Sequence, residues 1–119
     1  MPRFVVQEHH ATRLHWDFRL EHEGVAVSWA VPKGLPEEPG PRRLAVHVDD
    51  HSVSYMAWSG TIGRGSYGAG KVLIWDAGDY ELEKWEEDKI VVVLHGDRLE
   101  GRYALIHTGD ENWLIQKTR

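Results

Sequence analysis

Hydrophobic and polar residues alternate along much of this chain, most regularly between Leu14 and His22. In that stretch Leu14, Trp16, Phe18 and Leu20 are apolar, and the residues between them are polar. A period of two is typical of a β-strand with one buried and one exposed face. The pattern therefore predicts a strand at 14–22 whose polar face displays an imidazole, a carboxylate and a guanidinium two residues apart.

Similar β-type segments, separated by turn residues, recur along the chain. They predict further strands at 3–7, 25–31, 44–48, 71–76, 80–85, 89–95, 102–107 and 113–117. Turns are expected at 23–24, 76–79, 86–88, 96–97 and 109–110, and a turn or single helical turn at 8–13. No stretch keeps the 3.6-residue period of a long helix. Eight or nine short strands at this spacing indicate a closed sandwich or a single barrel. We expect an all-β fold, a compact barrel of about eight strands formed by residues 1–119 as one domain, with one or two short helical turns.

One helical turn is expected directly after the predicted strand at 44–48. Asp49 and Asp50 are of a residue type that caps helix N-termini, and the turn would run through Met56. His51 and Tyr55 are four positions apart, so a helical turn would place both side chains on the same side.

The segment 60–70 contains five glycines and matches two phosphate-binding patterns. Residues 63–68 fit G-x-G-x-x-G, and residues 65–71 fit G-x-x-x-x-G-K. Both patterns require a helix immediately afterwards, whereas an apolar β-type run begins at Val72. We therefore interpret the segment as a loop that turns the sheet sharply, with room for the close approach of a nucleic-acid backbone.

Composition narrows the class of protein. The chain has 119 residues, no cysteine and a net charge of −5, which excludes thiolate metal sites and argues against broad non-specific nucleic-acid binding. Residues 72–119 carry six Lys and Arg against eleven Asp and Glu, whereas residues 1–71 are balanced. Six of the eight histidines lie at or before His51, so we expect the chemistry in the first half. No apolar run is long enough for a membrane span and no signal peptide is evident, which predicts a cytoplasmic location.

The polar face of the strand at 14–22 suits a divalent metal beside a phosphate. His15 and Asp17 share this face, and His9 needs only a short turn to lie alongside. Two imidazoles and one carboxylate form a facial metal site that leaves positions open for water or substrate. Arg19, two residues beyond the carboxylate, offers a planar fork that fits phosphate oxygens.

Several segments, in order along nearly the whole chain, resemble one known family. The matching stretches are 4–7 with His9, 13–20, 28–34, 50–51 with Tyr55, 65–70 and 74–76. They are similar to the 3′-phosphoesterase domain of bacterial DNA ligase D, which also occurs as free-standing archaeal and bacterial proteins. The resemblance implies a compact β-barrel and a manganese-dependent enzyme that heals 3′ ends during DNA end joining. Such an enzyme removes a terminal ribonucleoside and then a 3′-phosphate, and it leaves a 3′-OH.

The resemblance also assigns roles to individual residues. It implies that His9, His15 and Asp17 bind the metal, which is manganese in the family, although zinc, cobalt and iron also suit this donor set. It further implies roles at the scissile phosphate for Arg19 and His51, a nearby position for Tyr55, and supporting roles for Lys33 and Arg43.

The sequence departs from the family pattern at two places. The residue after the first ligand is commonly Asp and here is His10, so His9 and His10 compete as ligands; parity and spacing favour His9. The acidic pair before His51 is commonly Glu-Asp and here is Asp49-Asp50, which shortens a carboxylate expected to support the site.

Expected partners follow from the same resemblance, and two other functions remain open. The substrates would be DNA primer-templates or RNA-tailed 3′ ends, the partners a DNA ligase, a polymerase or Ku, and the protein a monomer without membrane contact. One alternative is a non-catalytic nucleic-acid-binding barrel with Trp16, Trp58 and Tyr67 as stacking platforms. The other is a cupin-like metal enzyme acting on small molecules. The other tryptophans are expected to pack in the core (Trp29, Trp75, Trp85, Trp113), and three histidines in strand patterns to be structural (His47, His95, His107).

Overall fold

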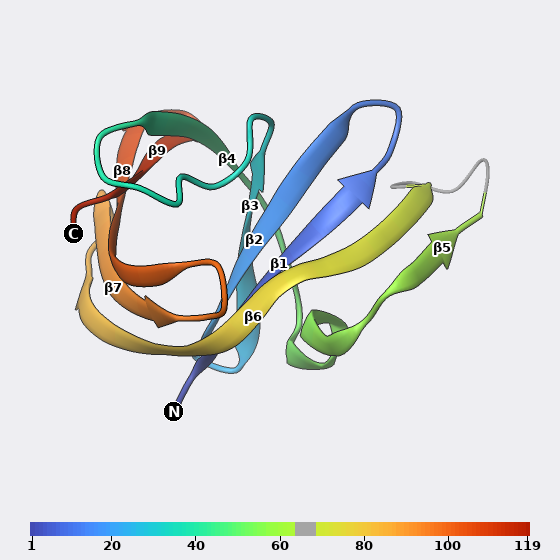
Figure 1. Cartoon of the computed structure of the whole chain (residues 1–119), viewed down its shortest axis with the longest axis horizontal. Coiled ribbons are helices and arrows are strands. Elements are labelled where there is room, and N and C mark those ends of the chain that lie inside the picture. The colour runs from blue at the N-terminus through green and yellow to red at the C-terminus, as the bar shows by residue number, and fades with distance from the viewer. Residues whose placement is uncertain (64–68) are drawn as a thin grey trace.

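The chain folds into a closed antiparallel β-barrel, seen in a computed structural model that describes residues 1–63 and 69–119 (Figure 1). Within these residues the strand order is β1-β2-β3-β4-β9-β8-β7-β6-β5, and an additional pairing of β1 with β6 closes eight strands into the barrel. The elements are β1 (Arg3–His10), β2 (Leu14–His22), β3 (Val25–Val31), β4 (Arg42–Ser52), the 3₁₀ helix η1 (Val53–Ala57), β5 (Gly60–Ile62), β6 (Gly70–Trp85), β7 (Lys89–His95), β8 (Glu100–Gly109) and β9 (Asn112–Lys117). The predicted all-β barrel with a short helical turn is confirmed.

The barrel interior is the main hydrophobic core. Trp29, Tyr80 and Tyr103 are its largest fully buried side chains. Both phenol groups are satisfied at the ends of the core, because Tyr80 donates to the carbonyl of Glu21 at 2.6 Å and Tyr103 to that of Pro36 at 2.7 Å. Of the remaining tryptophans predicted to pack, Trp113 is buried in this core, and Trp75 and Trp85 pack against it in partly buried positions.

Strands β2, β3 and β7 coincide with their predicted ranges. The β2–β3 connection is a two-residue turn in which Glu23 and Gly24 both have positive φ, at 50° and 84°. This turn geometry matches the twist of the adjoining strands, so a short polar-glycine pair was a reliable signal for a hairpin.

The predicted turn at 76–79 is wrong, because β6 runs unbroken through it. Asp76 and Gly78 are residue types typical of turns, but here both lie within the strand. Asp76 is buried, and a Cβ added at Gly78 would clash with the carbonyl oxygen of His95. Glycine therefore allows the close contact with β7 where β6 passes from its pairing with β1 to its pairing with β7.

Two other predicted turns are also strands. β1 continues to His10 where a turn or helical turn was expected at 8–13, because His9 and His10 pair with β2. β4 extends to Ser52, so the predicted helical start at Asp49 and Asp50 is wrong; η1 begins at Val53, without a side-chain cap from Ser52.

The glycine-rich segment is partly strand. Residues 60–62 form β5, which was not predicted, and β6 begins at Gly70. A strand and not a helix therefore follows the two glycine patterns, which agrees with their rejection as nucleotide-binding motifs. Predictions that fall on 64–68, including Tyr67 as a stacking platform, lie outside the described residues.

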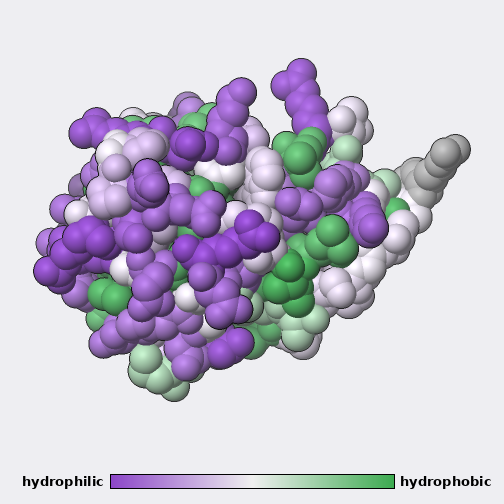
Figure 2. Space-filling view, in the orientation of Figure 1, coloured by the Kyte–Doolittle hydropathy of each residue, from purple (hydrophilic) through white to green (hydrophobic). Residues whose placement is uncertain are grey.

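The visible face of the barrel is largely hydrophilic, with a hydrophobic patch over the first half of β6 (Figure 2). Leu73 and Ile74, neighbours in this strand, are 39% and 43% exposed. Within the described part of the chain, no helix has the length and apolar character needed to cross a bilayer.

Candidate active site

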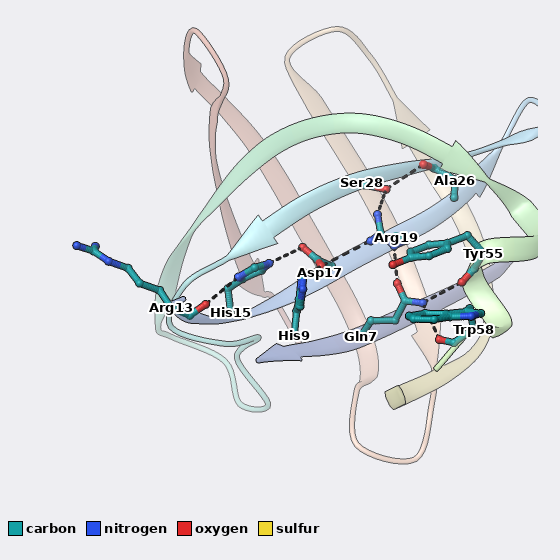
Figure 3. Close-up of polar contacts among 10 residues, drawn as sticks. All are labelled: Gln7, His9, Arg13, His15, Asp17, Arg19, Ala26, Ser28, Tyr55 and Trp58. Atoms are coloured by element: carbon teal, nitrogen blue, oxygen red, sulfur yellow. Dashed lines mark hydrogen bonds and ion pairs between the residues drawn. The ribbon is translucent and has the colours of Figure 1, made fainter. Parts of the chain in front are cut away.

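The candidate site lies on the outer face of strands β1, β2 and β3. In β2, Phe18 and Leu20 belong to the barrel core and Trp16 packs against it, so the alternating residues His15, Asp17 and Arg19 point outward. Outward-facing residues of β1 and β3 join them in a row. Residues 51–58, from the end of β4 through η1 to Trp58, lie against the Arg19 end of this row, and we call this segment the roof (Figure 3). The buried inner face thus fixes which polar side chains meet outside, as the period of two predicted.

Three outward side chains form a group that could hold a metal ion. His9 and His15 are direct partners across β1 and β2, and ligand atoms of both rings and of Asp17 lie within 4.8 Å of one another. His9 Nδ1 is 3.4 Å from Asp17 Oδ2, and His15 Nε2 is 3.2 Å from Asp17 Oδ1. Of the two competing histidines, the structure brings His9 into the group, whereas the His10 ring lies 2.7 Å from Glu8.

The protonation of this group follows from its contacts. The hydrogen bond with Asp17 raises the pKa of His15, against the opposing effect of burial. Burial by itself would raise the pKa of Asp17, but the hydrogen bond with His15 and the charge of Arg19 outweigh it and lower that pKa. Asp17 is therefore a carboxylate at neutral pH. His15 Nδ1 lies 3.2 Å from the carbonyl of Arg13, which orients the ring so that Nε2 faces Asp17.

Among the described residues of this row, Arg19 is the only other charged side chain that is buried, and it is 3% exposed. Its Nε donates to Gln7 Oε1 at 2.6 Å, one terminal nitrogen donates to Ser28 Oγ at 2.7 Å, and the other lies 3.6 Å from Asp17 Oδ2. Burial lowers the pKa of Arg19, and the negative charge of Asp17 opposes that shift. A guanidinium has five N–H donors. The contacts therefore fix its plane and leave donors for an anion in the pocket.

Gln7 links the guanidinium to the roof. Its Oε1 accepts from Arg19, while its Nε2 donates to the carbonyls of Tyr55 at 2.9 Å and Trp58 at 3.1 Å (Figure 3). Sequence reasoning assigned no role to Gln7 or Ser28. The alternation of faces could have pointed to both residues. Gln7 shares the outward face of β1 with His9, and Ser28 lies directly opposite Arg19 on β3.

A β-bulge in β4 brings His51 to the site. Val48 pairs with Ser28 and His51 with Ala26, so Asp49 and Asp50 together oppose one residue of β3. The extra residue turns His51 onto the same face as Val48, and both line the pocket.

Tyr55 lies beside His51, as their spacing predicted, although His51 belongs to a strand and not to a helical turn. The two rings stack with centroids 4.5 Å apart, and the Tyr55 ring centre is 5.0 Å from the guanidinium carbon of Arg19. Burial, followed by the charge of Arg19, lowers the pKa of His51.

These groups surround a pocket of about 540 Å³. It is lined by the three candidate ligands, Arg19, His51 and Tyr55, by Asp49 and Asp50, and by the apolar side chains of Ala11, Ala30, Val48 and Ile62. The sequence of residues 7–107 matches the model of the DNA ligase D 3′-phosphoesterase domain. The chain belongs to this family.

Relatives of the phosphoesterase domain agree with the family match. The chain is 52% identical over 120 residues to the multifunctional non-homologous end joining protein LigD of Mycobacterium bovis, 50% identical over 128 residues to that of Mycolicibacterium smegmatis, and 43% identical over 126 residues to that of Pseudomonas aeruginosa. Each match covers 98% of this chain but only 15–17% of the relative. The chain thus corresponds to one segment of much longer proteins.

The structure does not place Lys33 and Arg43 among the residues that line the pocket of the phosphoesterase domain. Arg43 instead donates to the carbonyl of Lys33 at 2.7 Å and so holds the turn after β3. That turn packs on Trp16, since a Cβ added at Gly34 would meet the indole ring at 3.6 Å. Within the described residues, this pair therefore acts on the turn after β3 and not on the pocket itself.

Proposed function

We propose that this domain is a metal-dependent phosphoesterase that removes a 3′-terminal ribonucleoside or 3′-phosphate from nucleic-acid ends and leaves a 3′-OH. The observation that supports this most directly is that Asp17 contacts both candidate histidine ligands and the buried guanidinium of Arg19. One carboxylate therefore joins a cation-binding group to a group that binds phosphate oxygens.

The donor set fits a divalent transition metal. His9 Nδ1 and His15 Nε2 lie 3.4 Å and 3.2 Å from the two oxygens of Asp17, and one ligand atom from each of the three residues lies within 4.8 Å of the others. These separations are close to the roughly 3–3.5 Å between ligand atoms that are each about 2.1 Å from one ion. Without a cation the pocket holds the carboxylates of Asp17, Asp49 and Asp50 against one guanidinium, which disfavours a phosphate. His9, His15 and Asp17 would hold Mn²⁺, with Zn²⁺ or Co²⁺ as substitutes. When bound, the ion would neutralise phosphate charge and polarise phosphorus as a Lewis acid.

The protein's own groups orient the phosphate. Arg19 is held by Gln7 and Ser28 before any substrate arrives, so its donors need little reorganisation as charge develops on the phosphoryl oxygens. His51 also lines the pocket and would give a ring N–H to another phosphate oxygen or to the leaving group. Tyr55 closes the pocket above the guanidinium and limits its contact with water.

The relatives' names extend the proposal to a pathway. They are non-homologous end joining proteins, so we place this activity in the healing of 3′ ends before ligation. The substrates are DNA primer-templates and RNA-tailed 3′ ends, and the functional partners are a DNA ligase, a polymerase or Ku, with the domain acting as a cytoplasmic monomer.

The test is hydrolysis of a 5′-labelled primer-template that ends in a 3′-phosphate or in a single ribonucleotide. We expect conversion to a 3′-OH end with Mn²⁺ and none with EDTA, and we expect an Asp17→Asn variant to be inactive under both conditions. Salt-sensitive binding without turnover at any metal concentration would overturn the proposal in favour of a binding module. Iron-dependent oxygen uptake without phosphate release would overturn it in favour of a cupin-like enzyme.

A further inference from the structure

Three aromatic rings form a continuous column above the pocket. His51 stacks on Tyr55 with centroids 4.5 Å apart and an interplanar angle of 21°. Tyr55 in turn stacks on Trp58, with centroids 5.6 Å apart and an angle of 14°. His51 and Tyr55 line the pocket, whereas Trp58 does not. The column therefore connects His51 and Tyr55, which line the pocket, to Trp58, which lies behind them.

Trp58 is itself fixed from several directions. Its backbone N–H donates to the carbonyl of Tyr55 at 3.0 Å, and its own carbonyl accepts from Gln7 at 3.1 Å. On the β5 side, a Cβ added at Gly60 would lie 3.1 Å from the indole ring, so the glycine backbone abuts it closely. Trp58 thus lies between the Tyr55 ring and strand β5.

The helical part of the roof is short and depends on its neighbours for its shape. η1 has five residues and no side-chain cap, and Met56 is its one buried residue. A 3₁₀ segment of this length has little stability of its own. Beyond the packing of Val53 and Met56, Tyr55 is held by Arg19 and His51 on the pocket side, by the hydrogen bond from Gln7 to its carbonyl, and on the other side by the stack with Trp58.

We propose that Trp58 is a positioning residue for the phosphoesterase reaction. By holding Tyr55 it keeps the phenol ring against Arg19 and the imidazole of His51 turned toward the pocket, although it does not touch the phosphate. This inference rests on the proposed function. It differs from the sequence-based alternative in which Trp58 is a platform for a substrate base, because one indole face is used by Tyr55 and β5 lies beside the ring.

The experiment compares Trp58→Leu with Trp58→Phe in the Mn²⁺-loaded protein, using the 3′-phosphate primer-template. Trp58→Leu should lower kcat about 10- to 100-fold, as expected for misplaced reacting groups, and change KM by less than about threefold. Trp58→Phe retains a ring that can stack on Tyr55, so it should restore most of kcat. The matched control is Trp85→Leu, which removes a half-buried tryptophan stacked on His22 at the far end of β2 and should leave kcat unchanged.

A second measurement does not depend on turnover. Because the two rings stack with centroids 4.5 Å apart, we expect the Tyr55 ring current to shift the His51 Cε1–H resonance in the NMR spectrum of the metal-free protein. We expect this resonance to move toward the free-histidine position in Trp58→Leu and to stay in place in Trp58→Phe and Trp85→Leu. Gly60→Ala, which presses on the indole without removing it, should shift the same resonance to an intermediate extent.

The outcomes separate the two proposals. An unshifted His51 resonance, or wild-type kcat in a folded Trp58→Leu protein, would overturn the positioning role. A change in KM alone would also overturn it, because it would mean that Trp58 contacts the substrate. Wild-type protein without phosphoesterase activity would refute the proposed function, and the resonance would then decide the structural role of Trp58 by itself.

Discussion

Two aspartates of this barrel are almost equally buried, Asp17 at 7% and Asp76 at 5% exposure, but their partners differ in kind. Asp76 accepts three backbone N–H groups of the β7–β8 connection, from Asp97 at 3.0 Å, Arg98 at 3.2 Å and Leu99 at 2.8 Å. Asp17 instead faces two imidazoles and a guanidinium beside an open pocket.

The difference separates structural from chemical use of a buried charge. Backbone amides are fixed dipoles that cannot titrate or leave, so they satisfy Asp76 permanently and lock a turn to the strand. The partners of Asp17 are side chains, which can exchange a mutual contact for a cation or an anion. Buried charge by itself therefore identifies neither role; the chemical nature of the partners does.

The largest expected effect is the loss of activity in Asp17→Asn. The amide would remove the charge that joins the candidate ligands to Arg19, and kcat for release of a 3′-phosphate should fall by at least about 100- to 1000-fold. Stability should also fall, because the buried guanidinium of Arg19 and the His15 ring lose the carboxylate that pairs with them. Steady-state kinetics and a thermal melt of the same sample measure both. Retention of near-normal kcat would refute the assignment.

Asp76→Asn should lower stability but leave activity in place, in contrast to Asp17→Asn. The amide keeps one acceptor oxygen but turns an NH₂ toward backbone N–H donors, so the free energy of unfolding should fall by roughly 2–4 kcal/mol. Below the melting temperature kcat should remain within about threefold of wild type, because Asp76 does not line the pocket. Urea titration monitored by tryptophan fluorescence gives the stability. Our distinction fails if the folded variant is inactive.

Gln7→Met tests a residue that has both structural and chemical contacts. It removes the acceptor of the Arg19 Nε–H and both donors to the roof carbonyls, in a volume similar to that of glutamine. We expect kcat to fall about 10- to 100-fold and stability by roughly 1–3 kcal/mol. Ser28→Ala, which removes one Arg19 contact and leaves the roof intact, is the control and should cost less in both measurements. Equal losses in the two variants would contradict a separate role for the roof.

The sequence predicted what depends on local alternation and missed what depends on contacts distant in the chain. The period of two placed His15, Asp17 and Arg19 on one face of β2 because the barrel core accepts only the apolar face. The continuity of β6 could not be read locally, since Gly78 is required by the carbonyl of His95 on another strand.

The site shows the same division. His9 was found by parity and spacing, but the bulge that turns His51 into the pocket arises from the register of β4 against β3, which the sequence does not display. Gln7 was overlooked because its partners are distant in the chain: Arg19 is 12 positions away, and the carbonyls of Tyr55 and Trp58 are 48 and 51 positions away.

The smallest expected effect is on the pH dependence of stability, and it concerns an exposed cluster of His95 with Glu81 and Glu100. His95 bonds Glu81 at 2.6 Å and Glu100 at 3.4 Å, and these hydrogen bonds raise its pKa although the ring is exposed. Because the folded protein holds this proton more tightly than the unfolded chain, the contribution is fully present below pH about 6.5 and is lost as the pH rises through the folded pKa. Solvent screening keeps the contribution small. The urea midpoint should therefore fall slightly more between pH 5.5 and pH 8.5 in wild type than in His95→Gln. Identical pH dependence in the two proteins would show that this exposed cluster, unlike the two buried carboxylates, makes no measurable contribution to stability.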